Sequence, residues 1–234
     1  MPHDIARYID HTLLKPDAHR SQVMQLCQEA IAYRFAAVCI NPTWLPVAGH
    51  MLRDEPEIAL CTVIGFPLGA DMPEVKQFEA RMAIDLGAME LDMVINIGLL
   101  RSGDDAAVLE DIAAVVNICR EGRAQSKVII ETALLSAGEK ERVCRLVVQA
   151  GADFIKTSTG FAAEGAKVED VELMHRLVHS AGVKIKAAGG IRSIADALKM
   201  IRAGADRIGT SSGVKIVTEA LEQNLTINLE ERGS

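Results

Sequence analysis

The sequence contains few aromatic residues and no excess of positive charge. Aromatic side chains make up 3% of the 234 residues, and the formal net charge at pH 7 is −7. Sequence-independent binding of nucleic acid requires a basic surface. Binding of single strands also requires aromatic side chains on which bases stack. The composition argues against nucleic acid as a partner, and we expect a small-molecule partner instead.

Long apolar runs are also missing. The first fifteen residues, MPHDIARYIDHTLLK, include acidic residues and a histidine and have no continuous apolar core. We therefore expect neither a signal peptide nor a transmembrane span, and no contact with a membrane. The five cysteines form no CxxC pair; they are Cys27, Cys39, Cys61, Cys119 and Cys144. Their odd number and wide spacing predict reduced thiols, packed as small hydrophobic side chains in a cytoplasmic protein.

Metal-binding motifs are equally scarce. His175 and His179 are four residues apart on a predicted helix, but no third ligand accompanies them in a pattern such as HExxH. A solvated helix face explains this pair better than a metal site. We predict that the protein uses no metal and no other cofactor.

What the sequence does contain is a repeated alternation of strand-like and helix-like segments. Between short apolar segments rich in β-branched residues lie stretches whose apolar residues recur at i, i+3, i+4 and i+7. The eight predicted strands begin at Tyr8, Ala36, Ile58, Met89, Lys127, Asp153, Val183 and Asp206. Several predicted helices end in a glycine just before the next strand, as in AGADFIK and AGVKIK, because glycine takes the left-handed conformation there without steric cost.

Eight strand–helix units predict an α/β fold in which parallel strands close into a single (β/α)8 barrel, a TIM barrel. The chain has the length of such a barrel and lacks linkers and low-complexity segments, so we expect one domain over residues 1–234. An open, doubly wound sheet is the alternative. Against it, no GxGxxG motif follows the first strand, and no break in the pattern marks a switch point.

Two lysines lie in the middle of predicted strands, where an ammonium group is costly to bury. Lys156 lies in FIKTSTG and Lys186 in KIKAAGGIR. A lysine usually relieves the cost of burial by a lowered pKa, which makes it neutral and nucleophilic. An apolar pocket and a second nearby cation favour this change, and the pair can supply both. The alternative is that each side chain extends to a strand end and keeps its amine in water.

Side-chain alternation places these lysines inside the predicted barrel together with two aspartates. Lys156 and Lys186 face inward from neighbouring strands about 4.8 Å apart, and Asp92 and Asp10 face inward from the fourth and first strands. We expect the aspartates to pair with the lysines in a mixed cluster that contains one charged and one neutral amine. A purely structural ion pair is the alternative for each aspartate.

Glycine- and serine-rich loops follow the last three predicted strands. They are TSTG at 157–160, then AAGGIRS, then GTSSG. Barrel enzymes place their active sites at the C-terminal ends of the strands, and the loops after strands seven and eight often bind phosphate. Backbone N–H groups at glycines and hydroxyls at a helix N-terminus suit an anion. The loops therefore predict a phosphorylated substrate, with tight strand-to-helix turns as the alternative.

Taken in order, the motifs IDHTLL, AVCINP, ELDMVIN, KVIIET, ADFIKTSTG, KAAGGIR and RIGTSSG resemble the class I deoxyribose-phosphate aldolases over nearly the whole chain. FIKTSTG together with KAAGGIR is highly specific. The resemblance implies a (β/α)8 barrel that reversibly cleaves 2-deoxy-D-ribose 5-phosphate to acetaldehyde and D-glyceraldehyde 3-phosphate. It also implies a homo-oligomer, a dimer or larger.

The resemblance assigns roles to individual residues. It implies that Lys156 forms the Schiff base, that Lys186 perturbs it and helps to move protons, and that Asp92 transfers protons. The substrate-binding set that it implies is Asp10, Thr12, Thr157, Gly160, Gly189, Gly190, Gly209, Ser211 and Ser212. Two other readings stay open at this point: another lysine-dependent sugar-phosphate aldolase, and a phosphosugar-binding barrel without catalysis.

The sequence departs from some members of this family at two places, which predicts a weaker dependence on the substrate phosphate. Phe161 stands where some members carry a lysine that contacts phosphate, and the chain ends in NLEERGS without the tyrosine that others have. The measurement is kcat/KM for deoxyribose with and without its phosphate. A complete loss of activity on the unphosphorylated sugar would contradict the prediction.

Overall fold

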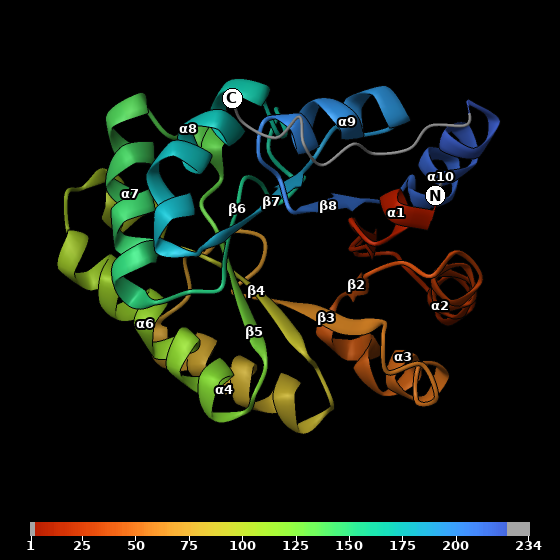
Figure 1. The fold of residues 1–234 in the computed structure, drawn as a ribbon. Helices are drawn as coiled ribbons and strands as arrows, with labels where there is room; N and C mark the ends of the chain where they lie inside the picture. Colours follow the sequence, from red (N-terminus) through yellow and green to blue (C-terminus); the bar gives the residue numbers. More distant parts are fainter. Residues whose placement is uncertain (1–2, 224–234) are drawn as a thin grey trace.

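The eight predicted strands form one closed parallel barrel in sequence order, as the sequence predicted (Figure 1). The structure is a computed structural model, and it describes residues 3–223. The strands are β1 (Ile9–Leu13), β2 (Ala37–Ile40), β3 (Ala59–Ile64), β4 (Glu90–Val94), β5 (Gln125–Ile129), β6 (Phe154–Lys156), β7 (Lys184–Ala188) and β8 (Arg207–Thr210). Hydrogen bonding of β8 to β1 closes the barrel and leaves no free sheet edge.

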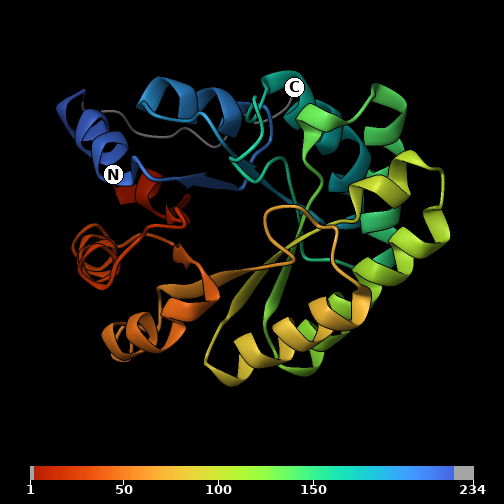
Figure 2. The ribbon, with the colours of Figure 1, turned by 180° about the vertical axis from the view of Figure 1, so that it is seen from behind.

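Helices connect the strands and surround the barrel, which is clear when the ribbon is seen from either side (Figures 1 and 2). They are α1 (His3–Ala6), α2 (Arg20–Tyr33), α3 (Leu45–Met51), α4 (Pro73–Asp85), α5 (Ile97–Arg101), α6 (Asp105–Glu121), α7 (Ala137–Ala150), α8 (Val168–Val178), α9 (Ile194–Arg202) and α10 (Gly213–Glu222). Short 3-10 helices lie at Pro42–Trp44, Thr132–Leu134 and His179–Ala181. Between residues 3 and 223, no helix has the length and apolar character needed to cross a membrane.

The predicted helix-stop signals have the expected backbone conformation. Gly151 ends α7 with φ 71° and ψ 37°, and its N–H bonds to the carbonyls of Val147 and Val148. Gly182 has φ 77° just before β7. At the other end of α7, Ser136 and Glu139 form a reciprocal capping box. These local signals fix where each helix stops and hence where the next strand enters the barrel.

The two faces of the sheet differ sharply in chemistry. On β4, Leu91 and Met93 are buried in the apolar layer between the strands and the helices. Glu90 and Asp92 alternate with them and point into the barrel, where the structure shows them bonded to cations. The apolar layer holds the helices on the sheet, whereas the barrel interior contains polar and charged side chains. All five cysteines are free and buried, as predicted.

The observed strands differ from the predicted ones mainly at their ends. The sixth was predicted to run from Asp153 to Ser158, but β6 covers only Phe154–Lys156. The fifth begins at Gln125, two residues before the predicted start at Lys127. This second difference matters for the site because it moves Lys127 from the end of a strand to its middle.

Candidate active site

The barrel interior holds a cluster of charged side chains that reaches from β1 to β8. Its cations are Lys127, Lys156, Lys186 and Arg207, and its carboxylates are Asp10, Glu90 and Asp92. The side chains are at most 4% exposed, apart from Arg207 at 13%. Charges buried this completely are tolerated only when they are paired.

Asp92 is the centre of this cluster. Its Oδ2 accepts hydrogen bonds from the ammonium groups of Lys156 and Lys186, each at 2.7 Å. Its Oδ1 accepts from Lys127 at 2.9 Å. Lys156 and Lys186 are direct partners in the register of β6 and β7, so both reach the same oxygen. Burial by itself would raise the pKa of Asp92, but the charges of the three lysines hold this pKa well below its usual range.

Asp10 is the second anion shared by several cations. Its Oδ2 lies 2.6 Å from the Nζ of Lys186, and its Oδ1 accepts from the Nε of Arg207 at 2.6 Å. Burial opposes ionisation of Asp10, yet the charges of Lys186, Arg207 and Lys127 lower its pKa. Burial would likewise lower the pKa of Lys186, but Asp10 and Asp92 raise it above the ordinary value. Lys186 is therefore held as a cation.

Lys156 differs from the other cations in its pairing and its access. Lys186 contacts two carboxylates, and Lys127 lies within ion-pair distance of three, whereas the described ion pairs of Lys156 involve Asp92 alone. Lys156 also lines a cavity, which Lys127 and Lys186 do not. It is the amine of the cluster that a small molecule can reach.

This cavity, of about 390 Å³, lies at the C-terminal ends of the strands. Its lining includes Thr12, Leu13, Leu14, Lys15, Lys156, Thr159, Gly160, Phe161, Ala188, Gly189, Gly190, Ile191, Arg192, Gly209, Thr210 and Ser211. Gly160, Gly189 and Gly190 have φ values of 80–88°, a region that favours glycine. The loops therefore bring backbone close to the cavity where side chains would fill it.

Six of the nine predicted substrate-binding residues line the cavity: Thr12, Gly160, Gly189, Gly190, Gly209 and Ser211. The other three lie elsewhere. Asp10 is buried in the charged cluster, where it pairs with Lys186. Thr157 is buried, and its hydroxyl donates to the carbonyl of Ala188. The backbone N–H of Ser212 donates to the hydroxyl of Thr210.

Gly209 also leaves space for the side chain of Lys186 on the neighbouring strand. A Cβ added there would lie 3.0 Å from the Cε of Lys186 and 3.0 Å from the Cβ of Ala188. The missing side chain thus leaves room for Lys186 to extend toward Asp10 and Asp92.

Several residues of the site were not identified from the sequence. Lys127, Glu90 and Arg207 complete the charged cluster, and Lys15 and Arg192 add cations to the cavity wall. Strand alternation contained the signal for Glu90 and Arg207. Glu90 is two residues before Asp92 and Arg207 two before Gly209, so each shares the inward face of a residue that was identified.

Phe161 also lies at the cavity. Its side chain is half exposed, and its ring meets that of Phe66 edge to face at a centroid distance of 5.3 Å. This part of the cavity wall is therefore apolar. Lys15 and Arg192 lie on the same cavity wall and keep it positively charged. The terminal segment NLEERGS lies outside the described residues.

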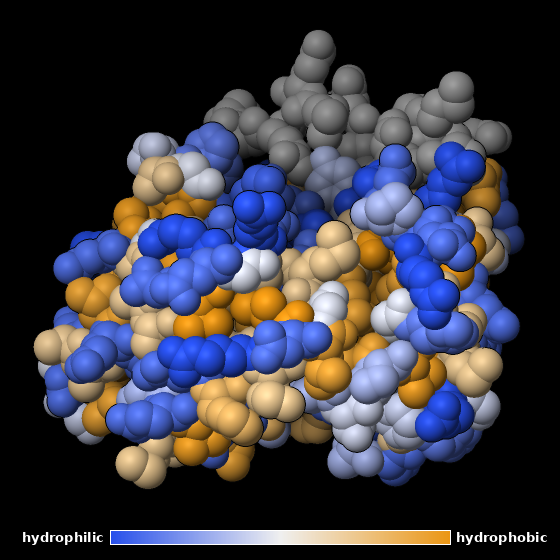
Figure 3. Space-filling model, turned by 90° about the horizontal axis from the view of Figure 1, so that it is seen from below, coloured by the Kyte–Doolittle hydropathy of each residue, from blue (hydrophilic) through white to orange (hydrophobic). Residues whose placement is uncertain are grey.

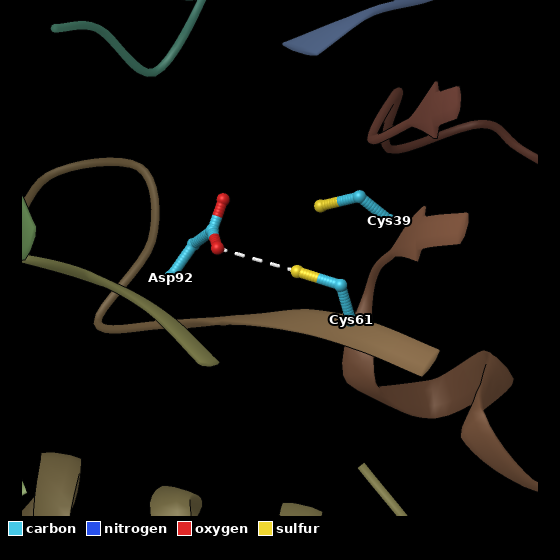
Figure 4. A group of neighbouring side chains, drawn as sticks. All are labelled: Cys39, Cys61 and Asp92. Carbon is cyan, nitrogen blue, oxygen red and sulfur yellow. Dashed lines mark hydrogen bonds between the residues drawn. The ribbon is translucent and has the colours of Figure 1, made fainter. Parts of the chain in front are cut away.

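Cys39, Cys61 and Asp92 form a buried group beside the charged cluster (Figure 4). Their ligand atoms lie within 4.8 Å of one another, and the Cys61 thiol donates to Asp92 Oδ1 at 3.2 Å. Burial raises the pKa of Cys61 well above its ordinary value, which keeps the thiol protonated. Because three ammonium groups already compensate Asp92, the local charge disfavours a further cation at this group.

Glu131 holds the loop that carries Thr159 and Gly160. It follows β5 with an unusual φ of 50°, and its Oε2 accepts hydrogen bonds from the backbone N–H of Thr159 at 3.1 Å and from the hydroxyl of that residue. Its Oε1 is buried and has no hydrogen-bond partner among residues 3–223. A strained, buried carboxylate beside a cavity indicates that the loop position matters for function.

Comparisons with known proteins identify a common family. A family model described as DeoC/LacD family aldolase matches residues 5–219. The chain is similar to the deoxyribose-phosphate aldolase of Shouchella clausii, with 56% identity over 220 residues that cover 94% of this chain and 97% of the relative. It is 54% identical to the deoxyribose-phosphate aldolase of Halalkalibacterium halodurans over 217 residues, or 93% and 96% of the two chains.

A solved structure agrees with these matches. The deoxyribose phosphate aldolase of Aeropyrum pernix, described as a tetramer, has a TM-score of 0.89 and 36% identity to this chain. The match covers 96% of this chain and 94% of the other.

Replacement of Asp92 tests its central position. We expect Asp92→Asn to lower the free energy of unfolding by about 3–5 kcal/mol, since it leaves several buried ammonium groups without their shared counter-ion. The pKa of Asp92 in the folded protein lies well below its ordinary value of 3.8. The contribution of ionised Asp92 to the free energy of unfolding is therefore complete above pH 3.8, and it is lost as the pH falls through the pKa of the folded state. Urea unfolding of both proteins over a pH series measures the difference.

Asp71→Asn, at an exposed position, is the matched control and should change the free energy of unfolding by less than about 0.5 kcal/mol. A difference between wild type and Asp92→Asn that vanishes between about pH 7 and about pH 5 would contradict the assignment.

Replacement of Glu131 tests the position of the loop. Glu131→Ala removes the acceptor of the Thr159 N–H, and an unpaired buried donor costs about 1–3 kcal/mol. We expect KM for a phosphorylated substrate to rise about tenfold while kcat changes less. Glu131→Gln retains an acceptor oxygen and should recover most of the loss. Equal kinetics for all three proteins would show that this contact does not position the loop.

Proposed function

Because the chain belongs to the DeoC/LacD family of aldolases, we propose that it reversibly cleaves 2-deoxy-D-ribose 5-phosphate to acetaldehyde and D-glyceraldehyde 3-phosphate through a Schiff base on Lys156. The full-length relatives named deoxyribose-phosphate aldolase support the substrate. The observation that carries the mechanism is the position of Lys156, which is the amine that joins the buried cluster to the cavity.

The charge of the cluster supports Lys156 as the nucleophile. Four cations face three carboxylates when every group is ionised, so one positive charge is in excess within a buried site. Loss of one proton from a lysine removes this excess. Lys156 is the amine whose departure from the charged state disturbs the fewest pairs, because Lys127 and Lys186 are shared among several carboxylates.

Carbon–carbon bond formation starts from this neutral amine. The Nζ of Lys156 adds to the carbonyl carbon of acetaldehyde, the oxygen takes a proton, and loss of water gives a protonated imine. Removal of a proton from the adjacent methyl carbon then gives an enamine, because the imine accepts the electron pair. The enamine carbon attacks the aldehyde carbon of glyceraldehyde 3-phosphate, whose oxygen takes a proton. Water hydrolyses the resulting imine, which releases the sugar phosphate and restores Lys156.

Asp92 and Lys186 support the proton transfers. Oδ2 of Asp92 lies 2.7 Å from both amines, so a proton leaving Lys156 can pass by way of this carboxylate to water, and its departure from the cluster removes the excess charge. Lys186 stays charged because Asp10 and Asp92 raise its pKa, and its charge disfavours a second cation beside it. An intervening water can extend these transfers to the carbon atoms of the substrate.

The cavity wall has the donors that the phosphate requires. Gly160, Gly189 and Gly190 expose backbone, Ser211 adds a hydroxyl, and Lys15 and Arg192 add positive charge. These groups line the cavity together with Lys156, whose side chain is otherwise buried and paired with Asp92. A chain with an aldehyde at one end and a phosphate at the other matches this arrangement.

A related aldolase reaction on another sugar phosphate is the second candidate. The matching family model covers LacD as well as DeoC aldolases, and both readings use the cavity and Lys156. A non-catalytic binding barrel would have no use for an amine with so few ion pairs in the lining of its cavity. Both reactions pass through an imine on Lys156, so the two aldolases are distinguished by which sugar phosphate they cleave.

Trapping of the imine tests the mechanism. Incubation with acetaldehyde and borohydride should leave an N-ethyl group on Lys156, because the reductant adds hydride to the imine carbon. Peptide mapping by mass spectrometry locates the group. Lys156→Met should abolish the specific adduct and the cleavage of deoxyribose 5-phosphate, whereas Lys184→Met, which changes an exposed lysine of β7, should preserve both.

Two results would overturn parts of the proposal. Absence of the adduct at Lys156 would refute the Schiff-base role, and a matching adduct level at Lys184 would show that the labelling is non-specific. An adduct at Lys156 without cleavage of deoxyribose 5-phosphate would favour an aldolase with another substrate.

A further inference from the structure

The mechanism assigns no role to Phe161, although this residue lines the cavity. Its side chain is 51% exposed, and its ring contacts the ring of Phe66. Exposed apolar residues are common in this protein: on the face seen from below, apolar residues, in orange, are scattered among hydrophilic ones (Figure 3). Exposure alone therefore has no functional meaning. What distinguishes Phe161 is the place of its partner in the fold.

The two rings come from separate loops at the C-terminal end of the barrel. Phe66 follows β3 and Phe161 follows β6, and β4 and β5 lie between these strands in the barrel order. The ring centroids are 5.3 Å apart and the ring planes meet at 89°, a geometry that aromatic pairs prefer. The contact therefore joins the loops of two strands that are not neighbours.

The loop after β3 is fixed by contacts of its own. The N–H of Gly65 donates to Oε2 of Glu79 on α4 at 2.7 Å, and the N–H of Gly69 donates to the carbonyl of Gly65 at 2.7 Å. A Cβ added at Gly69 would lie 1.9 Å from the carbonyl oxygen of Ile95, so this loop packs directly against the backbone that follows β4. Phe66 also packs against buried apolar residues of β2 and β3. It is therefore a fixed support for the ring that it contacts.

The loop after β6 carries part of the cavity wall and is held near both ends. Near its start, the N–H of Thr159 donates to Glu131 at 3.1 Å. Near its end, the N–H of Ala166 donates to two consecutive carbonyls at the end of β7, each at 3.1 Å. Gly160 and Phe161 lie between these points and line the cavity. The contact with the loop after β3 thus supports the part of the loop that faces the cavity.

We propose that Phe66 is a positioning residue for the reaction and that it acts through Phe161. The Phe66 ring fixes the Phe161 ring, and the N–H of Phe161 donates to the hydroxyl of Thr159 at 3.0 Å. The backbone around Gly160 thereby keeps its place on the cavity wall when the sugar phosphate binds. The effect of Phe66 on catalysis rests on the proposed function, whereas its support of the loop does not.

Steady-state kinetics of single and double variants test this role. Phe66→Ala should raise KM for 2-deoxyribose 5-phosphate about two- to tenfold while kcat changes less, because the lost ring contact affects substrate binding. Phe66→Tyr retains a ring and should keep KM within about twofold of the wild-type value. In a Phe161→Ala background, Phe66→Ala should have little further effect, since the partner ring is already absent. Leu68→Ala, at an exposed position of the same loop, is the control and should leave both constants unchanged.

Hydrogen–deuterium exchange of peptides that cover residues 157–167 tests the support of the loop without any substrate. Phe66→Ala should speed the exchange of these amides, whereas Phe66→Tyr and Leu68→Ala should not. Circular dichroism checks that each variant is folded. If Phe66→Ala does not fold, Phe66→Leu, which keeps apolar packing but has no ring, takes its place.

The outcomes separate this role from the proposed function. Equal exchange in wild type and Phe66→Ala, or an undiminished effect of Phe66→Ala in the Phe161→Ala background, would overturn the role of Phe66. Faster exchange with an unchanged KM would overturn its effect on the substrate. A wild-type protein that does not cleave 2-deoxyribose 5-phosphate would refute the proposed function instead, and the exchange rates would still decide whether Phe66 holds the loop.

Discussion

Three lysine ammonium groups converge on the carboxylate of Asp92 in the middle of the barrel, where water is excluded. Each of these cations would be too costly to bury alone, and they are tolerated because they share one anion with further help from Asp10 and Glu90. The barrels of this fold are usually filled by branched apolar side chains. Here a cluster of paired charged side chains fills part of the interior in place of apolar ones.

This exchange gives the site a fixed geometry. Lysine is a flexible side chain, but Lys156 is held by its ion pair with Asp92 and by the register of β6 with β7. Its amine consequently occupies a defined place in the cavity lining. The ordering cost of the side chain is met during folding rather than when a substrate binds, which is the usual advantage of preorganised sites.

Much of this arrangement was predictable because successive side chains along a strand point to opposite faces of the sheet. That rule, applied to the barrel order, placed Asp10, Asp92, Lys156 and Lys186 on one surface, and the structure brings these four side chains into contact. It failed for Lys127 because the strand was predicted to begin at that residue. Since β5 begins at Gln125, Lys127 belongs to the interior instead of an accessible end.

Positions beyond the strand ends were harder to predict. Alternation stops where β6 ends, so the sequence could not show that Thr157 turns toward the backbone of Ala188 or that Glu131 reaches Thr159. The cations Lys15 and Arg192 reach the cavity through loops whose paths depend on tertiary packing. The phosphate loops could be located by their glycines, but their contacts could not be assigned residue by residue.

The excess of one cation in the cluster also limits how the interior of this barrel can change during evolution. Loss of Glu90 alone would leave Lys127 and Arg207 with fewer counter-charges, whereas simultaneous loss of Glu90 and Lys127 would preserve the balance around Lys156. Viable sequences should therefore exchange these positions in oppositely charged pairs. A single charged substitution is tolerated on the outer helices, whereas inside the barrel two substitutions of opposite charge would have to occur together. The sequence of the interior should therefore change slowly.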